Sequence, residues 1–234
     1  MTEINQINKT NLDELFKHGA HFGFEKSRRH PSANSYIYGS KNRVDIFDLE
    51  KTHEALNKAL AFVTSLAANK STILFVGGKS EAREATRLNA ESLGMPYVAG
   101  RWIGGTLTNF SQVKKRIDTM LDLINQKEKG ELAKYTKKER LLIDRDIAKL
   151  QKMFGGIANM TSLPKALFII DPRFEKTALA EARSLNIPVI ALCGSDNNFT
   201  DIDFPIPGND SNRSSISYFL GEIKKSYNSG IVKA

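Results

Sequence analysis

Hydrophobic residues recur along the chain in two rhythms, and the change between them outlines the predicted elements. From Glu50 to Asn69 the apolar residues are three or four positions apart, which predicts an amphipathic helix. From Thr72 onward, short uninterrupted apolar runs alternate with stretches of helical spacing. The apolar runs predict strands at Thr72 to Val76, Tyr97 to Ala99, Ala166 to Ile170, Pro188 to Leu192 and Phe204 to Ile206.

The segments that follow most of these runs have the spacing of amphipathic helices. Helices are predicted at Ser80 to Leu93, Thr177 to Leu185 and Ser211 to Tyr227. Near-continuous apolar strands that alternate with helices indicate a parallel sheet covered on both faces. The predicted fold class is therefore α/β, with a flavodoxin- or Rossmann-like, doubly wound and mostly parallel sheet.

The N-terminal part of the chain predicts smaller elements. A helix is predicted at Asn11 to His18, because Asn11 and Glu14 have the spacing of a capping box. A β-hairpin is predicted farther along, with strands at Tyr36 to Tyr38 and Val44 to Leu49 joined by a turn at Gly39 to Asn42.

Two amphipathic helices interrupt the strand–helix alternation. Their apolar stripes consist of Phe110, Val113, Ile117, Met120, Leu121 and Ile124, and of Ile143, Ile147, Leu150 and Phe154. Thr136 and Glu139 form a capping box for the second helix, and Gly155-Gly156 can end it. The near-heptad spacing predicts an inserted α-helical coiled-coil hairpin at residues 111–155, whose two stripes can bury each other without help from the sheet. Residues 1–110 and 156–234 would then form one discontinuous α/β domain.

Positive charge is concentrated in two parts of the chain, whose formal net charge is +8. Residues 111–164 carry 12 basic and 7 acidic groups, and Lys26 to Arg43 includes five basic residues and no acidic one. Basic islands on a nearly neutral remainder favour a polyanionic partner, nucleic acid above all.

The candidate RNA-binding residues are taken from these islands and from two loops. Lys79 opens a helix after a tight turn, and Arg101 lies beside the only tryptophan, Trp102, which we expect to be buried. The predicted contacts are Lys26, Arg28, Arg29, Lys41, Arg43, Lys79, Arg101, Lys114, Lys115, Arg116, Lys137 and Lys138.

An alternative function is a phosphate- or nucleotide-binding enzyme on the same fold. Gly77-Gly78-Lys79-Ser80 is similar to a phosphate loop, but Ile73 replaces the first Walker glycine and Lys79 replaces the second glycine of the dinucleotide fingerprint. In an enzyme on this fold, the loops after Ile170 and Leu192 would carry the catalytic groups. Cys193 in the second of these segments has no histidine next to it in the sequence that could act as a base. We predict no catalytic residue and no cofactor.

Metal binding and membrane insertion are also not predicted. Cys193 is the only cysteine, so a disulfide framework and a cysteine zinc site within one chain are both excluded. The histidines His18, His21 and His30 lack a further ligand at suitable spacing. No apolar stretch approaches the roughly 20 residues of a membrane helix.

Several motifs together are specific for one family. They include His18-Gly19-Ala20-His21-Phe22-Gly23, Tyr36-Ile37-Tyr38-Gly39, Asp48-Leu49-Glu50-Lys51-Thr52, the run from Arg101 to Phe110, Leu163 to Asp171, and Ile206-Pro207-Gly208-Asn209-Asp210. In these residues, and in their order from about Leu12 to Gly221, the chain resembles the bacterial and organellar type of the small-subunit ribosomal protein two family.

The resemblance implies a flavodoxin-like domain with a protruding coiled-coil hairpin, which archaeal and eukaryotic cytosolic relatives lack. It implies a structural, non-enzymatic constituent of the small ribosomal subunit that contacts ribosomal RNA of the head and the body. Neighbouring small-subunit proteins would be partners, among them the mRNA-tethering ribosomal protein one. The expected location is the bacterial cytoplasm or an organellar matrix or stroma.

The chain departs from the family pattern in three places. Phe24 stands where a histidine is usual, and His30-Pro31 replaces an Asn-Pro pair. The loop from Gly194 to Phe199 replaces a loop rich in Asp, Thr and Asn. Contacts attributed to that loop in the family are therefore not transferred to this chain.

Overall fold

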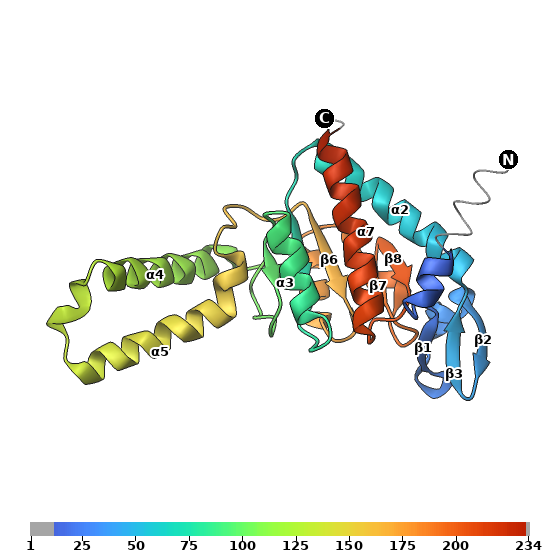
Figure 1. Ribbon diagram of the computed structural model, residues 1–234, viewed down its shortest axis with the longest axis horizontal. Coiled ribbons are helices and arrows are strands. Elements are labelled where there is room, and N and C mark those ends of the chain that lie inside the picture. Colours follow the sequence, from blue (N-terminus) through green and yellow to red (C-terminus); the bar gives the residue numbers. More distant parts are fainter. Residues whose placement is uncertain (1–11, 233–234) are drawn as a thin grey trace.

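A five-stranded parallel sheet forms the centre of the computed structural model, which describes residues 12–232 (Figure 1). Its strands are β4 (Ile73–Val76), β5 (Tyr97–Val98), β6 (Ala166–Ile170), β7 (Val189–Cys193) and β8 (Phe204–Pro207). They are arranged in the order β5-β4-β6-β7-β8, and every neighbouring pair is parallel. Counted along the chain this order is 2-1-3-4-5, the flavodoxin-like arrangement. The predicted α/β class and doubly wound sheet are confirmed.

Helices cover both faces of this sheet. They are α2 (Leu49–Ala68), α3 (Arg83–Ser92), α6 (Lys176–Ser184) and α7 (Arg213–Val232). Side chains alternate along β4, so Ile73 and Phe75 pack in the cluster of α2, α3 and α7, whereas Leu74 and Val76 pack in the cluster of α6. Burial on both faces explains why these strands are continuous apolar runs.

A second, three-stranded antiparallel sheet with the order β1-β3-β2 lies beside the carboxyl ends of the parallel strands. It consists of β1 (Phe22–Glu25), β2 (Ile37–Lys41) and β3 (Val44–Phe47). The sequence did not predict β1, which is only four residues long and includes Gly23. The predicted hairpin exists, but its turn is at Asn42-Arg43 because both residues adopt positive φ, the geometry of a two-residue hairpin turn.

Most predicted helix bounds differ from the observed ones by a few residues. Residues 12–17 are helical and Gly19 ends that helix with a φ of +70°, whereas the proposed capping role of Asn11 lies outside the described residues. The helix α3 begins three residues later than predicted, because Ser80 to Ala82 form a turn. Conversely, α7 extends to Val232, five residues beyond the predicted end at Tyr227.

Two helices, α4 (Phe110–Glu128) and α5 (Lys137–Phe154), extend away from the sheet at the end opposite the three-stranded sheet (Figure 1). They run antiparallel, and Lys127 pairs with Asp144 across them at 2.7 Å. The capping box of Thr136 and Glu139 is present as predicted. Leu121 was wrongly assigned to the buried stripe, since 46% of it is exposed.

The base of this helix pair belongs to the main core. Val113, Ile117 and Phe154 pack in the same cluster as α6 and the sheet, while Met120 and Ile147 farther out are buried outside that cluster. The expectation that the two stripes bury each other without the sheet is therefore wrong for the base of the pair. It holds only for the part beyond the core.

A buried carboxylate fixes the loop that leads from the sheet into α4. Glu181 of α6 accepts hydrogen bonds from the Trp102 indole at 3.0 Å and from the backbone of Gly105, Leu107 and Thr108 at 2.8–3.2 Å. Burial raises the pKa of Glu181, but these hydrogen bonds outweigh burial and leave the pKa below its ordinary value. Trp102 is buried, as predicted.

Replacing this carboxylate should destabilise the fold. In Glu181→Gln an amide NH2 group would face several N–H donors, so we expect a loss of about 2–3 kcal/mol in the free energy of unfolding. Urea denaturation measures the loss. Glu54→Gln, at an exposed position of α2, should change stability by less than about 0.5 kcal/mol. Equal stability of the two variants would contradict the anchoring role of Glu181.

Candidate nucleic-acid interface

The first basic island projects from the three-stranded sheet. Lys41 ends β2 and Arg43 is the second residue of the β2–β3 turn, and the backbone N–H of Lys26 donates to the carbonyl of Arg43 at 2.8 Å. All three side chains are exposed. The local backbone therefore brings three cations, separated in sequence, to one end of the molecule.

Arg29 from the same island has a structural partner. Its guanidinium donates through two nitrogens to the fully buried carboxylate of Asp45 and also reaches Ser40 Oγ at 2.9 Å. Burial raises the pKa of Asp45, but the hydrogen bonds from Arg29 and Ser40 outweigh burial and lower the pKa overall. Arg29 is consequently much less available to a ligand than its position in the sequence indicates.

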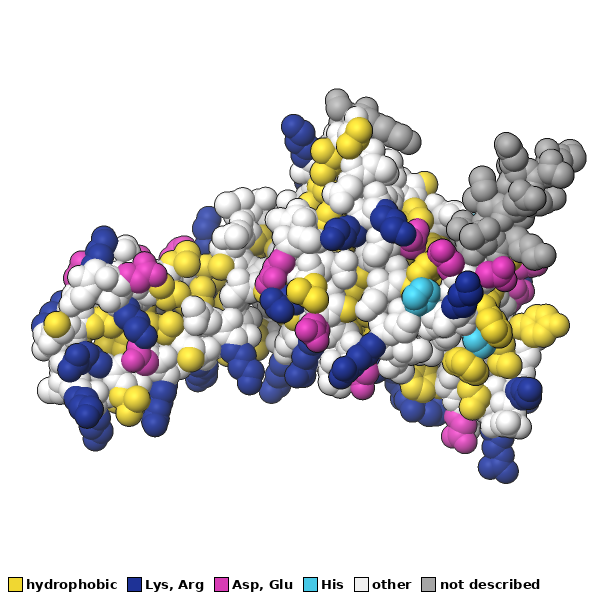
Figure 2. Space-filling view, in the orientation of Figure 1, with side chains coloured by type: hydrophobic (Ala, Val, Ile, Leu, Met, Phe, Trp, Pro, Cys, Tyr) yellow, Lys and Arg dark blue, Asp and Glu magenta, His cyan; other side chains and the backbone are white. Residues whose placement is uncertain are grey.

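The second basic island lies on α4 and α5, where Figure 2 shows Lys and Arg side chains around the protruding pair. Lys114, Lys115 and Arg116 are exposed near the start of α4, and Lys137 and Lys138 begin α5. Among residues 12–232 no ion pair involves these five side chains or Arg101, which is exposed in the loop between β5 and α4. Together with Lys26, Lys41 and Arg43, they are the nine predicted contacts that have no ion pair with any described residue.

The carboxyl edge of the parallel sheet, where ligands bind in folds of this kind, is occupied by the protein itself. The backbone N–H of Gly78 donates to Glu175 Oε1 at 2.9 Å, and Gly78 has no room for a Cβ beside the Gly100 carbonyl. Lys79 donates to Asp171 at 3.1 Å and to Ser211 at 2.9 Å. The groups that a phosphate loop would offer are thus used internally.

The three-stranded sheet also closes this edge. The backbone N–H of Phe24 donates to Ser195 Oγ at 2.8 Å, and the ammonium of Lys79 is 5.4 Å from the centre of the Phe24 ring. A Cβ on Gly194 would come within 2.8 Å of that ring. Phe24 therefore packs directly on the loop that follows β7.

Buried acids at this edge are held in an unfavourable environment. Burial, with a smaller contribution from the nearby Asp171, raises the pKa of Glu175 to about 7 despite the Gly78 hydrogen bond. Burial and Asp171 also raise the pKa of Asp210, against the effect of Lys79 at 3.6 Å. The pKa of the Cys193 thiol is raised well above its ordinary value by burial, which makes the thiol a poor nucleophile.

The histidines are dispersed among different partners. His18 contacts Ser214, His21 stacks on Phe16, His53 contacts Asn57, and His30 caps the turn of helix that begins at Pro31. Within residues 12–232, no three His, Cys, Asp or Glu side chains are grouped so that they could hold a metal ion. No helix in the same range is long and apolar enough to cross a membrane.

Two cations that the sequence analysis missed lie beside Arg28. Arg173 follows β6 and donates to Asp196 Oδ2 at 2.7 Å, and Arg28 donates to the same oxygen at 3.0 Å. Lys176, the first residue of α6, lines one cleft together with Arg28 and Arg173. The signal available in sequence was the position of Arg173 immediately after a predicted strand.

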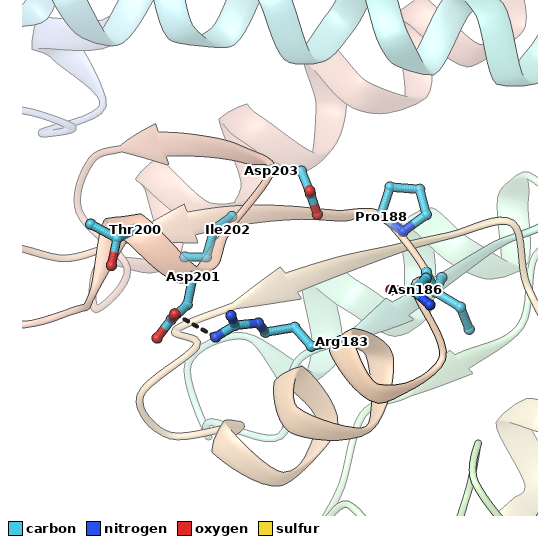
Figure 3. A pocket seen from close by; sticks show the side chains of 8 residues that line it. Arg183, Asn186, Pro188, Thr200, Asp201, Ile202 and Asp203 are labelled. Carbon is cyan, nitrogen blue, oxygen red and sulfur yellow. Dashed lines mark hydrogen bonds and ion pairs between the residues drawn. The ribbon is translucent and has the colours of Figure 1, made fainter.

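Another cavity, of about 400 Å³, lies at the opposite edge of the sheet (Figure 3). Arg183 pairs there with Asp201, and Asp203 accepts the backbone N–H of Val189 at 2.8 Å. The charged groups named here are therefore engaged with the protein. This cavity contains none of the predicted contacts.

Comparison with known families gives a match that spans almost the whole chain. The family model described as Ribosomal protein S2 matches residues 15–230. The chain belongs to the Ribosomal protein S2 family. It is accordingly a structural protein of the small ribosomal subunit and not an enzyme. The internally occupied carboxyl edge agrees with that assignment.

In this member of the Ribosomal protein S2 family, the pKa shifts of the buried acids predict that the free energy of unfolding depends on pH. The pKa of Glu175 is raised to about 7 in the folded state. The protonated group therefore contributes stability that is fully present below about pH 4.5 and is lost as the pH rises through about 7. The free energy of unfolding should thus be higher at pH 5 than at pH 8.

Urea denaturation at pH 5, 6.5 and 8 checks this expectation. Glu175→Gln cannot ionise, so this variant should lose part of the decrease between pH 5 and 8. An unchanged pH profile in the variant would show that Glu175 does not ionise in this range. The lowered pKa values of Asp45 and Glu181 act in the opposite direction and only at more acidic pH.

Proposed function

We propose that this chain binds small-subunit ribosomal RNA through exposed cations on the three-stranded sheet and along the helix pair α4–α5, including the loop that leads into it. The observation that carries the proposal is the unpaired state, within residues 12–232, of Lys26, Lys41, Arg43, Arg101, Lys114, Lys115, Arg116, Lys137 and Lys138. Unpaired surface cations neutralise phosphates and release condensed counterions, which supplies most of the non-specific affinity for nucleic acid. We leave Arg29 and Lys79 out of the interface because buried or partly buried carboxylates hold them.

In this proposal the pair α4–α5 is a coiled-coil arm that reaches RNA beyond the body of the protein. The near-heptad stripes, the antiparallel course and the excess of basic side chains support this role. Within the part of the chain that the structure describes, residues 12–110 and 156–232 would form the body from which residues 111–155 project. A positively charged surface on such an arm can neutralise phosphates of an RNA backbone.

The same proposal includes a position and partners that rest on the family resemblance. The chain would lie between the head and the body of a bacterial or organellar small subunit, contacting the RNA of both. Neighbouring small-subunit proteins, including the mRNA-tethering ribosomal protein one, would contact the remaining surface. The length of the molecule, with cations at both ends, supports a bridging role.

Removing the cations at the start of α4 should weaken RNA binding and its salt dependence together. We expect Lys114→Ala/Lys115→Ala/Arg116→Ala to reduce the slope of log affinity against log salt by up to about 2–3. Filter binding of small-subunit ribosomal RNA between 50 and 300 mM salt measures the slope. A matched control, Lys58→Ala/Lys224→Ala/Lys225→Ala on α2 and α7, removes three charges elsewhere and should change it much less. Equal slopes for both variants would contradict a localised interface.

The outer part of the arm should be dispensable for folding but needed for assembly. Replacing residues 126–142 by a short Gly-Ser linker removes six basic and three acidic groups and leaves Val113, Ile117 and Phe154 in the core. We expect a melting temperature within about 4 °C of the parent protein. Sucrose-gradient sedimentation should find the variant mostly free of small subunits. Normal incorporation would contradict an RNA-binding arm, and unfolding would place the tip in the core.

A further inference from the structure

A cleft of about 500 Å³ opens at the carboxyl edge of the sheet, between the segment Arg28 to Pro31 and the start of α6. Cations and apolar groups line it together: Arg28, Arg173 and Lys176 supply positive charge, and Pro31, Pro172 and Leu179 supply an apolar wall. Its position is separate from the nine exposed cations described above. It also lies beside the Gly194 to Phe199 loop, which departs from the family pattern.

One buried carboxylate oxygen brings two arginines together in this cleft. Asp196 Oδ2 accepts from Arg28 at 3.0 Å and from Arg173 at 2.7 Å, and only 3% of the Asp196 side chain is exposed. The two donor nitrogens are therefore less than about 6 Å apart, within the reach of a single phosphate group. Two guanidiniums do not gather at one oxygen without cost, because like charges repel.

Both arginines are held in place and both keep donors free. The Arg28 guanidinium lies 4.5 Å from the centre of the Phe24 ring, and the backbone N–H of Arg173 donates to Asn197 Oδ1 at 2.7 Å. About half of each side chain is exposed. Each guanidinium has five N–H groups, and within residues 12–232 each directs one hydrogen bond to a carboxylate.

The cleft carries more positive than negative charge. Asp196 offsets only one of the two arginines, and Lys176 has no ion pair among residues 12–232. The remaining acid in the lining, Asp201, is paired with Arg183. Arg29, the other cation in the lining, is already bonded to Asp45.

We propose that Arg28 and Arg173 act as one unit that binds a single phosphodiester of RNA, with Lys176 adding to the attraction. The proposal rests on the proposed RNA-binding function and gives it a defined subsite. Planar guanidiniums match the paired oxygens of a phosphodiester better than ammonium groups do. The apolar wall of Pro31, Pro172 and Leu179 accommodates the ribose next to that phosphate. A free phosphate ion would leave this wall uncovered.

The test compares single and double variants in binding to small-subunit ribosomal RNA. Near 0.1 M salt, loss of one phosphate contact corresponds to about a fivefold loss of affinity. We expect such a loss for Arg28→Ala and for Arg173→Ala. Because the two arginines share one phosphate, the double variant should lose no more than about tenfold, well short of the 25-fold or so for independent contacts. A multiplicative loss would overturn the shared site.

The control is Arg87→Ala on α3, which removes an arginine of similar exposure that is also paired with one carboxylate, Glu91. It should change affinity less than about twofold. Equal effects of Arg87→Ala and Arg173→Ala would overturn the proposal while leaving RNA binding intact. Absence of RNA binding by the parent protein would instead refute the proposed function itself.

Folding and ligand source are checked separately. If Arg173→Ala unfolds because Asp196 loses a partner, Lys176→Ala, which breaks no ion pair among the described residues, must still weaken RNA binding by a few fold; no loss would refute the cleft. Calorimetry with inorganic phosphate alone should give no saturable binding below about 1 mM, since a free ion gains only weak affinity from exposed cations. Tight, Arg173-dependent binding of phosphate would show that the site serves a free ion and not RNA.

Discussion

The carboxylate of Glu181 is the constraint on which the two-part architecture depends. It lies on α6, inside the core, yet its hydrogen-bond donors all come from the loop that carries the chain from β5 to α4. A loop with so many backbone N–H groups turned inward needs an acceptor, because unpaired buried donors are costly. Glu181 satisfies them at one point and thereby sets the direction in which α4 leaves the sheet. Val113 and Ile117 then continue the core into the arm.

The carboxyl edge of the sheet shows how a fold that often binds nucleotides serves a structural role here. Lys79 pairs with both Asp171 and Asp210, and the β1 residue Phe24 packs on the loop after β7. The backbone N–H of Gly78, in the loop before α3, donates to Glu175 and is not available to a ligand. What would be a ligand crevice has become an interface between the two sheets. In the function proposed above, the recognition of RNA is therefore left to cations around the rim of the sheet and on the helix pair α4–α5.

Sequence patterns predicted the elements whose burial is regular and failed where tertiary contacts decide. The parallel strands and their class follow from apolar runs such as Leu167 to Ile170, which need no knowledge of partners. The short strand β1 could not be predicted, because its pairing with β3 depends on residues twenty positions away. Charge patterns located the basic islands, but a list of cations cannot reveal that Arg29 is bonded to the buried Asp45. Arg173 was not among the predicted contacts because its spatial neighbour Arg28 is distant in sequence, so the sequence does not show that the two arginines lie together.

The distribution of charge separates stability from affinity. Residues 111–164 hold 12 basic against 7 acidic groups, so the surplus lies mostly on helices that project from the body. Placing the same surplus around the sheet would raise the electrostatic repulsion that every folded body must overcome. On an arm, the cations are surrounded by water and by dissolved ions, which weaken their mutual repulsion. If the arm binds RNA as proposed, approaching phosphates would meet this charge before they meet the core, so the helices would provide attraction at little cost to the sheet that supports them.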